Sequence, residues 1–223
     1  MSQSKARKKA KRAIPLAERV EEAYWDHVLE HGSVPASVYR FCKQLSVSEG
    51  EFFKEFSNFD AVEARYWERG IRECLEALDA DEDTAAYTAA QWLSAFYFTY
   101  FEMAVENRSK FLARFPNLKE GKSPRLSGWH RAFGEVADRF IEKAVEESSI
   151  AGGDRLKKAQ KRAVVFQARS LVDFHLQDTS PRFEDTDALI EKSVRFVFEA
   201  ARLPLIDSAV DLARFIIPRV SRG

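Results

Sequence analysis

The chain is poor in glycine, proline and cysteine, with nine, seven and two of these residues among 223. Because most of the glycines and prolines stand between periodic segments, long helices are favoured over a many-turned β fold. Cys42 and Cys74 fall inside helical patterns and lack metal-ligand spacing, so we expect two buried thiols in a reducing compartment. The formal net charge is zero, so the whole molecule has no bulk attraction for nucleic acid or anionic lipid.

Long apolar runs are also missing. No stretch approaches the ~18 uninterrupted apolar residues of a membrane-spanning helix, and the basic N-terminus lacks the apolar region of a secretory signal. We therefore expect a soluble, cytoplasmic protein. Hydrophobic residues nevertheless make up 45% of the chain, which excludes a largely disordered protein and allows one large or two small domains.

Helical periodicity covers most of the sequence. The predicted helices are 15–30, 35–45, 51–56, 58–78, 84–106, 129–149, 155–177, 185–202 and 204–220. A long loop with one helical turn is expected over 107–128, which holds two prolines and two glycines. Residues 1–12 carry six Lys or Arg and no acid, typical of a flexible basic tail. The expected organisation is this tail, a domain over 13–79 and a larger helical domain over 80–223.

Residues 14–67 carry a recognisable series of short motifs. They are a helix ended by His31-Gly32-Ser33, a helix with the pair Phe41-Cys42, a turn reading Val47-Ser48-Glu49-Gly50, and then Phe53 and Phe56. In order and spacing this series resembles the DNA-binding domain of the tetracycline-repressor (TetR) family. The resemblance implies an all-α fold: an N-terminal three-helix helix-turn-helix domain and a larger helical C-terminal domain for ligand binding and dimerisation.

Several positions depart from the family's pattern. Phe53 and Phe59 stand where the family usually has a phosphate-binding Tyr and Lys, and Glu51 replaces a small polar residue. Residues 15–69 hold eleven Asp or Glu against six Lys or Arg. Since phosphate neutralisation supplies most non-specific DNA affinity, these changes keep the fold and weaken the expected DNA contact. The basic tail partly offsets the negative charge.

The resemblance still indicates where DNA would be contacted. We expect Ser48, Glu51 and Lys54 near base edges, where a carboxylate can accept a hydrogen bond from cytosine. The phosphate contacts are expected from the second helix and the tail, through Ser37, Arg40, Lys43, Lys8, Lys9 and Arg12.

A dense aromatic run lies in the helix expected over 84–106. Such a run is usually core, but in TetR-like proteins this region lines a ligand cavity. The aromatic residues predicted to face a hydrophobic, ring-containing or lipid-like ligand are Trp92, Phe96, Tyr97, Tyr100, Phe133, Phe140, Phe166 and Phe174.

The last two predicted helices are amphipathic. The family pairs such helices into a four-helix dimer interface, for which we predict Leu189, Val194, Val197, Ile206, Val210, Ala213 and Ile217. The alternative for residues 204–220 is peripheral membrane contact, because arginines flank the apolar stripe while Asp207 and Asp211 oppose binding to anionic lipid.

Two functions of different kinds remain. The first is a homodimeric TetR-like transcriptional regulator that binds operator DNA and a hydrophobic small molecule. The second is a TetR-fold protein that has lost DNA binding and acts as a lipid- or isoprenoid-binding accessory protein, docking through its C-terminal helix. His27 and His31 have the spacing of a zinc pair but lack a third ligand. We expect no metal, no cofactor and no catalysis.

Overall fold

The computed structural model describes residues 14–121, 123–147 and 154–202, and within these ranges every regular element is helical. The chain divides into two compact units, with the boundary between Val62 and Glu63. The all-α prediction is confirmed. Residues 204–220, predicted as the last helix, lie outside the described residues.

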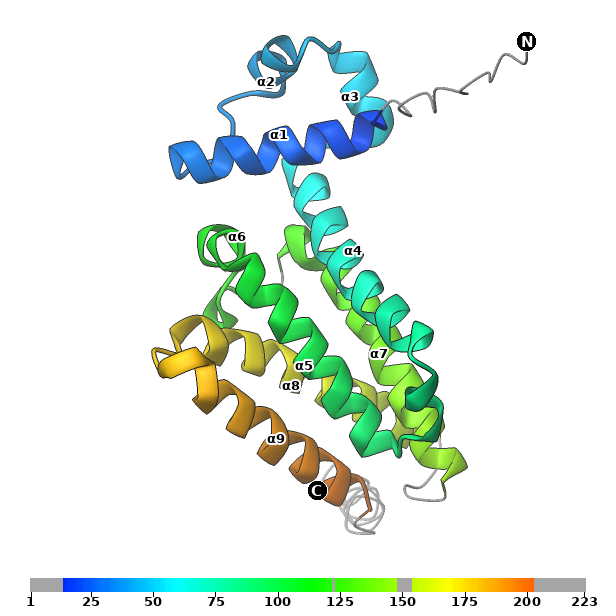
Figure 1. The fold of residues 1–223 in the computed structure, drawn as a ribbon. Helices are drawn as coiled ribbons and strands as arrows, with labels where there is room; N and C mark the ends of the chain where they lie inside the picture. Colours follow the sequence, from blue (N-terminus) through cyan, green and yellow to red (C-terminus); the bar gives the residue numbers. More distant parts are fainter. Residues whose placement is uncertain (1–13, 122, 148–153, 203–223) are drawn as a thin grey trace, which may run out of the picture. The chain divides into compact units, whose positions relative to one another are not determined.

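The first unit contains α1 (Leu16–His31), α2 (Val38–Leu45), α3 (Glu49–Glu55) and the start of α4 (Phe59–Ala80) (Figure 1). Its core is aromatic. The ring of Phe59 lies 5.4 Å from those of Tyr24 and Phe41 and 5.7 Å from that of Phe52. Phe59 therefore replaces the family's lysine with a side chain that joins α4 to α1, α2 and α3.

The ends of the first helices follow local chemistry. Gly32 ends α1 in the left-handed conformation, with φ of 67°, which glycine adopts at little steric cost. The second helix was predicted to begin at Pro35, and this was wrong. It begins at Val38, because the hydroxyl of Ser37 accepts a hydrogen bond from the backbone N–H of Arg40 and caps the first turn.

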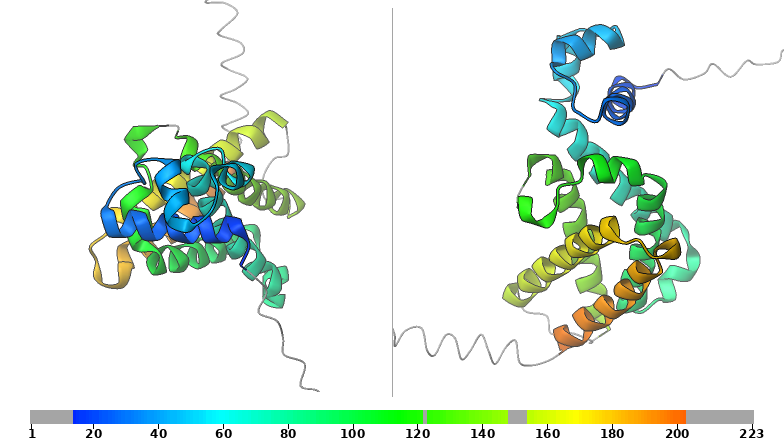
Figure 2. Two further views of the ribbon diagram at one scale, coloured as in Figure 1. Left: turned by 90° about the horizontal axis from the view of Figure 1, so that it is seen from above. Right: turned by 90° about the vertical axis from the view of Figure 1, so that its left-hand side faces the viewer.

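The second unit surrounds the apolar helix α5 (Ala89–Glu106), which packs against α7 (Ser127–Glu146) and α9 (Glu184–Arg202). Helix α8 (Asp154–Gln177) packs against both α7 and α9. Figures 1 and 2 show α8 turning back into α9 through the short segment η4 (Pro181–Phe183). Side-chain contacts from Gln167 to Ser193 and from His175 to Thr186 fix the two helices as an antiparallel pair.

The segment 107–128, predicted as a long loop with one helical turn, contains more helix than predicted. It contains α6 (Arg108–Arg114), η2 (Leu118–Glu120) and η3 (Pro124–Leu126). Phe111, Phe115 and Leu126 are buried and hold the segment against the core, which the glycine and proline count did not reveal. Helix α5 also begins later than predicted, at Ala89. The short helix η1 (Glu82–Ala86) precedes it.

The close approach of α7 to α4 depends on a missing side chain. A Cβ at Gly128 would lie 2.0 Å from the backbone oxygen of Ala64, so any other residue would force the helices apart. None of the helices in the described ranges combines the length and apolar character needed to cross a membrane.

Candidate functional site

The turn before α3 is closed by a reciprocal capping box. The backbone N–H of Ser48 donates to Glu51 Oε2 at 2.8 Å, and Ser48 Oγ accepts from the backbone N–H of Glu51 at 3.1 Å. The hydrogen bond from the backbone of Ser48 is the main cause that lowers the pKa of Glu51. The acidic residue that departs from the family's pattern thus stabilises the first turn of α3. Its expected contact with bases, like that of Ser48, stays a prediction.

Exposed cations lie on both helices of the turn. Arg40 and Lys43 on α2 and Lys54 on α3 are exposed. The same two helices expose three carboxylates, of Glu49, Glu51 and Glu55. The surface of α2 and α3 is therefore electrically balanced and does not have the excess of acid that the count over residues 15–69 suggested. The predicted contacts of Lys8, Lys9 and Arg12 lie outside the described residues.

Two aromatic side chains on this surface were missed as candidate contacts. Tyr39 of α2 is 59% exposed and Phe53 of α3 is 52% exposed, whereas the adjacent Phe52 is fully buried. The helical period of α2 could have identified Tyr39, since it lies beside, and not within, the core-facing stripe of Phe41, Cys42 and Leu45. An exposed phenol can donate to a phosphate, and an exposed phenyl ring can contact a thymine methyl group.

Six of the eight predicted ligand-binding aromatics are buried in the core. They are Trp92, Phe96, Tyr97, Tyr100, Phe133 and Phe140. The ring of Phe133 lies 4.3 Å from Trp129, 5.2 Å from Tyr100 and 5.6 Å from Phe96. Tyr100 accepts a 3.0 Å hydrogen bond from Trp129 Nε1, and burial raises the pKa of both buried tyrosines. These residues have the packing of a core.

The other two predicted ligand residues are not part of this core. Phe166 is 66% exposed and Phe174 is 39% exposed, both on α8, and Phe196 on the adjoining α9 is 71% exposed. Also on α8, Ser170 is half-exposed and Ala163 is exposed. We refer to the exposed side chains of Phe166, Phe174 and Phe196 on the α8–α9 pair as the α8–α9 face.

The predicted interface residues of α9 divide between the core and this face. Val194 is buried within the unit, while Leu189 and Val197 are half-exposed. Ile206, Val210, Ala213 and Ile217 lie outside the described residues. The role of the whole set in dimerisation stays a prediction.

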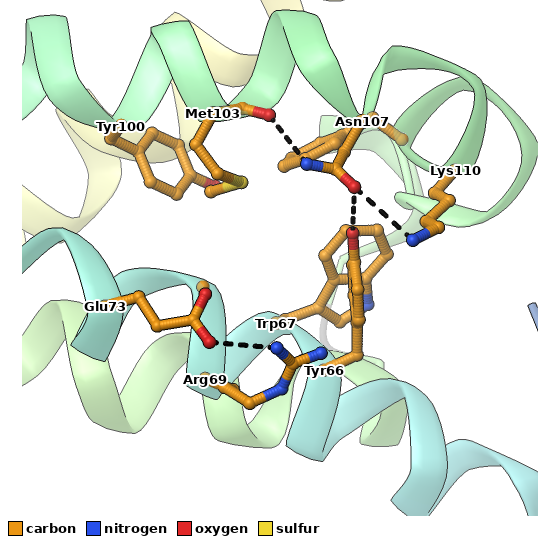
Figure 3. Close-up of a pocket in the computed structure, with 10 residues that line it drawn as sticks. Tyr66, Trp67, Arg69, Glu73, Tyr100, Met103, Asn107 and Lys110 are labelled. Carbon is orange, nitrogen blue, oxygen red and sulfur yellow. Dashed lines mark hydrogen bonds and ion pairs between the residues drawn. The ribbon is translucent and has the colours of Figure 1, made fainter. Parts of the chain in front are cut away.

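A small pocket opens in the second unit between α4, α5 and α6 (Figure 3). Its volume is about 180 Å³, and its lining residues are Tyr66, Trp67, Arg69, Gly70, Glu73, Tyr100, Met103, Asn107, Lys110 and Phe111. Figure 3 shows the Tyr66 hydroxyl reaching across to Asn107 Oδ1, at 2.9 Å. Among the predicted ligand-binding residues only Tyr100 lines this pocket.

Charged groups stand at the edge of the pocket. Arg69 pairs with Glu73 at 2.9 Å, with side chains 45% and 55% exposed. Lys110 Nζ donates to Asn107 Oδ1 at 3.3 Å and lies 4.8 Å from the centre of the Tyr66 ring. The pocket can therefore offer a ligand both aromatic surface and cationic donors. The sequence did hold a signal for this pocket, because Arg69 follows Tyr66 and Lys110 follows Asn107 at the three-residue spacing of one helix face. The aromatic run of α5 drew attention away from these two pairs.

The histidine pair of α1 has a structural arrangement. The rings of His27 and His31 stack with centroids 4.2 Å apart, and His31 Nδ1 lies 3.0 Å from the backbone oxygen of His27. Over the described ranges, no three His, Cys, Asp or Glu residues are grouped closely enough to hold a metal ion.

Comparison with known proteins places the chain in a family. The sequence model described as "Tetracyclin repressor-like, C-terminal domain" matches residues 92–216, which is more than half of the chain. One similar solved structure, described as a proposed TetR family transcription regulator from Shewanella sp. PV-4, is 15% identical. The similarity covers 82% of this chain and 96% of that one, with a TM-score of 0.49. A comparison with curated protein sequences found no match. On the strength of the match over residues 92–216, the chain belongs to the tetracycline-repressor family, whose members are typically non-enzymatic transcription regulators.

Proposed function

We propose that the protein is a homodimeric transcriptional regulator that binds operator DNA through α2 and α3 and responds to a small molecule in its C-terminal domain. The observation that carries this proposal is the surface of the first unit. Its helices α1 to α4 pack around a shared aromatic core, and its surface exposes Arg40 and Lys43 on α2 and Lys54 in the last turn of α3. Membership of a family of regulators supports the same function.

The proposed DNA contacts combine these cations with neighbouring groups. Arg40, Lys43 and Tyr39 contact phosphates, together with Ser37 at the N-terminus of α2 and the basic residues 1–12. Phe53 and Lys54 lie toward the bases in the major groove, with Phe53 contacting thymine methyl groups. The capping box of Ser48 and Glu51 holds α3 in the orientation that these contacts require.

The proposed dimer forms through the α8–α9 face. Phe166, Phe174 and Phe196 are large exposed aromatic side chains on one antiparallel helix pair. Exposed apolar groups gathered on one surface are characteristic of protein interaction sites, and aromatic residues are enriched there. A second copy presenting the same face would cover these rings in a two-fold arrangement.

The first test is fluorescence anisotropy with duplex DNA from upstream of the protein's own gene and with a scrambled duplex. Measurements at ~50 and ~200 mM salt are compared because affinity due to phosphate contacts falls steeply with salt. We expect preference for the upstream duplex and a smaller salt slope in the double variant Arg40→Gln, Lys43→Gln. Arg139→Gln, which removes an exposed guanidinium in the second unit, is the control and should bind as the unchanged protein does.

The second candidate is a member of the fold that does not bind DNA and carries a lipid or isoprenoid instead. The exposed carboxylates of Glu49 and Glu55 on α3, beside the exposed ring of Phe53, favour it. Equal, weak binding to both duplexes would contradict the regulator and support this alternative. Mass spectrometry of lipid extracted from the purified protein, with liposome binding, would then test it directly.

A further inference from the structure

The pocket between α4, α5 and α6 combines aromatic walls with an excess of positive charge. Tyr66 and Trp67 of α4, Tyr100 of α5 and Phe111 of α6 supply the rings. The charged lining residues are Arg69, Lys110 and Glu73, two cations against one carboxylate.

We propose that this pocket binds a small aromatic carboxylate. The ring of the ligand lies among the aromatic side chains, and its carboxylate is held by Arg69 and Lys110. The ligand carboxylate takes the place of Glu73 at the guanidinium, since Glu73 is more than half exposed and its carboxylate can move into water. Charge-assisted hydrogen bonds of this kind are among the strongest that a partly buried site offers.

The positions of the cations favour an anionic over a cationic ligand. Arg69 Cζ lies 5.6 Å and Lys110 Nζ lies 4.8 Å from the centre of the Tyr66 ring. A cationic ligand would have to compete with both groups for the same ring and would be repelled by them. An anion instead gains from both.

The size of the pocket limits the ligand. Its volume of about 180 Å³ is below the ~300 Å³ at which pockets for drug-sized molecules begin. A single ring with one acidic group is therefore the expected scale. Gly70 contributes to this space, because a Cβ there would lie 3.2 Å from Cε of Met103 on the opposite wall.

Asn107 gives the pocket a route to a structural response. It ends α5 and begins α6, its side-chain amide donates to the backbone oxygen of Met103 at 3.0 Å, and its Oδ1 accepts from Tyr66 and Lys110. A ligand that draws Lys110 away changes the contact of Asn107 with Tyr66 on α4. Helix α4 begins at Phe59, in the first unit, and so connects the pocket to the unit proposed to bind DNA. That this change regulates DNA binding rests on the proposed function.

Isothermal titration calorimetry on the full-length protein without DNA tests the pocket. The probes are benzoate, the neutral benzamide of nearly the same shape, and the cationic benzylamine. We expect binding of benzoate, and at least ~10-fold weaker binding of the other two, since ~10-fold corresponds to loss of one charge-assisted contact. Comparable affinity for benzamide, or no binding of benzoate, would overturn the proposal.

Variants then locate the binding site. Arg69→Gln and Lys110→Met should each weaken benzoate binding ~10-fold or more, and Gly70→Ala should weaken it by filling the pocket. Arg139→Gln is the matched control. Its ion pair with Asp79 has side chains 46% and 54% exposed, nearly the values of the Arg69–Glu73 pair. Equal benzoate affinity in all four variants would place the anion elsewhere and refute the assignment.

The two proposals fail separately in these experiments. Benzoate binding that the pocket variants abolish, in a protein with no preference for its upstream DNA, would sustain the pocket and refute the regulator. Specific DNA binding in a protein that does not bind benzoate would support the regulator and refute the pocket.

Discussion

Helices α5 and α7 on one side, and α8 and α9 on the other, use aromatic residues in opposite ways. Phe96 and Phe133 are fully buried and in ring contact with each other, whereas Phe166 and Phe196 are more than 60% exposed. All four belong to the same compact unit, and all four stand in helices. The difference lies in whether another of the described helices covers the ring.

This contrast separates stability from association. A ring enclosed on all sides contributes transfer and packing energy to folding of the single chain. A ring left on the surface contributes nothing comparable until a partner covers it. The number of aromatic residues therefore indicates how much apolar surface the protein must bury. The tertiary structure shows whether the same chain buries each ring or leaves it for a partner.

The largest expected effect is on the buried side of the comparison. Phe133→Ala should lower the free energy of unfolding by about 3–5 kcal/mol, because it opens a cavity among Phe96, Tyr100 and Trp129. Urea unfolding followed by tryptophan fluorescence measures the change. Phe166→Ala, at low protein concentration, should stay within about 0.5 kcal/mol of the unchanged protein. A similar loss of unfolding free energy in both variants would contradict the distinction between buried and exposed rings.

The adjacent residues Phe174 and His175 also differ in burial, since Phe174 is 39% exposed and His175 only 1% exposed. Burial, with the nearby Arg108, lowers the pKa of His175 from 6.5 to about 4. Between these values the unfolded chain binds a proton that the folded chain does not, so stability falls as the pH falls. The loss should approach about 3 kcal/mol between pH 6.5 and 4. Urea titrations across this range should show the slope, and His175→Gln should abolish it; an unchanged slope in that variant would assign it to other groups.

On the exposed side, removing a ring should weaken association. Phe166→Ala and Phe196→Ala should each cost about 2 kcal/mol of dimerisation, or roughly 30-fold in the dissociation constant, if each ring is a central contact of the interface. Sedimentation equilibrium measures this. Leu29→Ala is the matched control, because Leu29 is 43% exposed on α1, which belongs to the other compact unit. An unchanged dissociation constant in both phenylalanine variants would exclude this face as the interface.

Helix α3 offers the same comparison of an exposed with a buried phenylalanine, and the smallest effect on stability is expected there. Phe53→Ala should change the free energy of unfolding by less than about 0.5 kcal/mol, because the ring is 52% exposed, whereas Phe52→Ala should cost about 3 kcal/mol or more. Phe53→Ala should instead reduce the preference for the upstream duplex over the scrambled one. A large stability loss from Phe53→Ala would show that its ring is structural.

Much of the fold could be predicted from the sequence. Helical periodicity located α1, α5, α7, α8 and α9 to within a few residues, and the series containing Gly32, Ser48 and Phe53 resembled the helix-turn-helix pattern of the family. The errors have local causes. The glycine and proline count concealed α6, since buried Phe111 and Phe115 outweigh the turn-forming residues around them.

The candidate sites were less accessible to sequence analysis. Glu51 could be counted as a negative charge, but its capping contact with Ser48 depends on the conformation of the turn. Phe166 and Phe174 could be recognised as apolar, but not assigned to the surface. The pocket was missed because its residues come from three helices separated along the chain.

By itself the sequence determined that this protein is helical, where most of its helices run and which family pattern its N-terminal region follows. These properties depend on local periodicity and on helix-capping chemistry, and both are determined by residues close together in the sequence. Only the tertiary structure decided which aromatic rings are enclosed, which stand uncovered on the α8–α9 face, and how Arg69, Lys110 and Tyr66 meet at one pocket. Those outcomes depend on which surfaces distant helices cover, and burial of a side chain is a property of the whole packed unit.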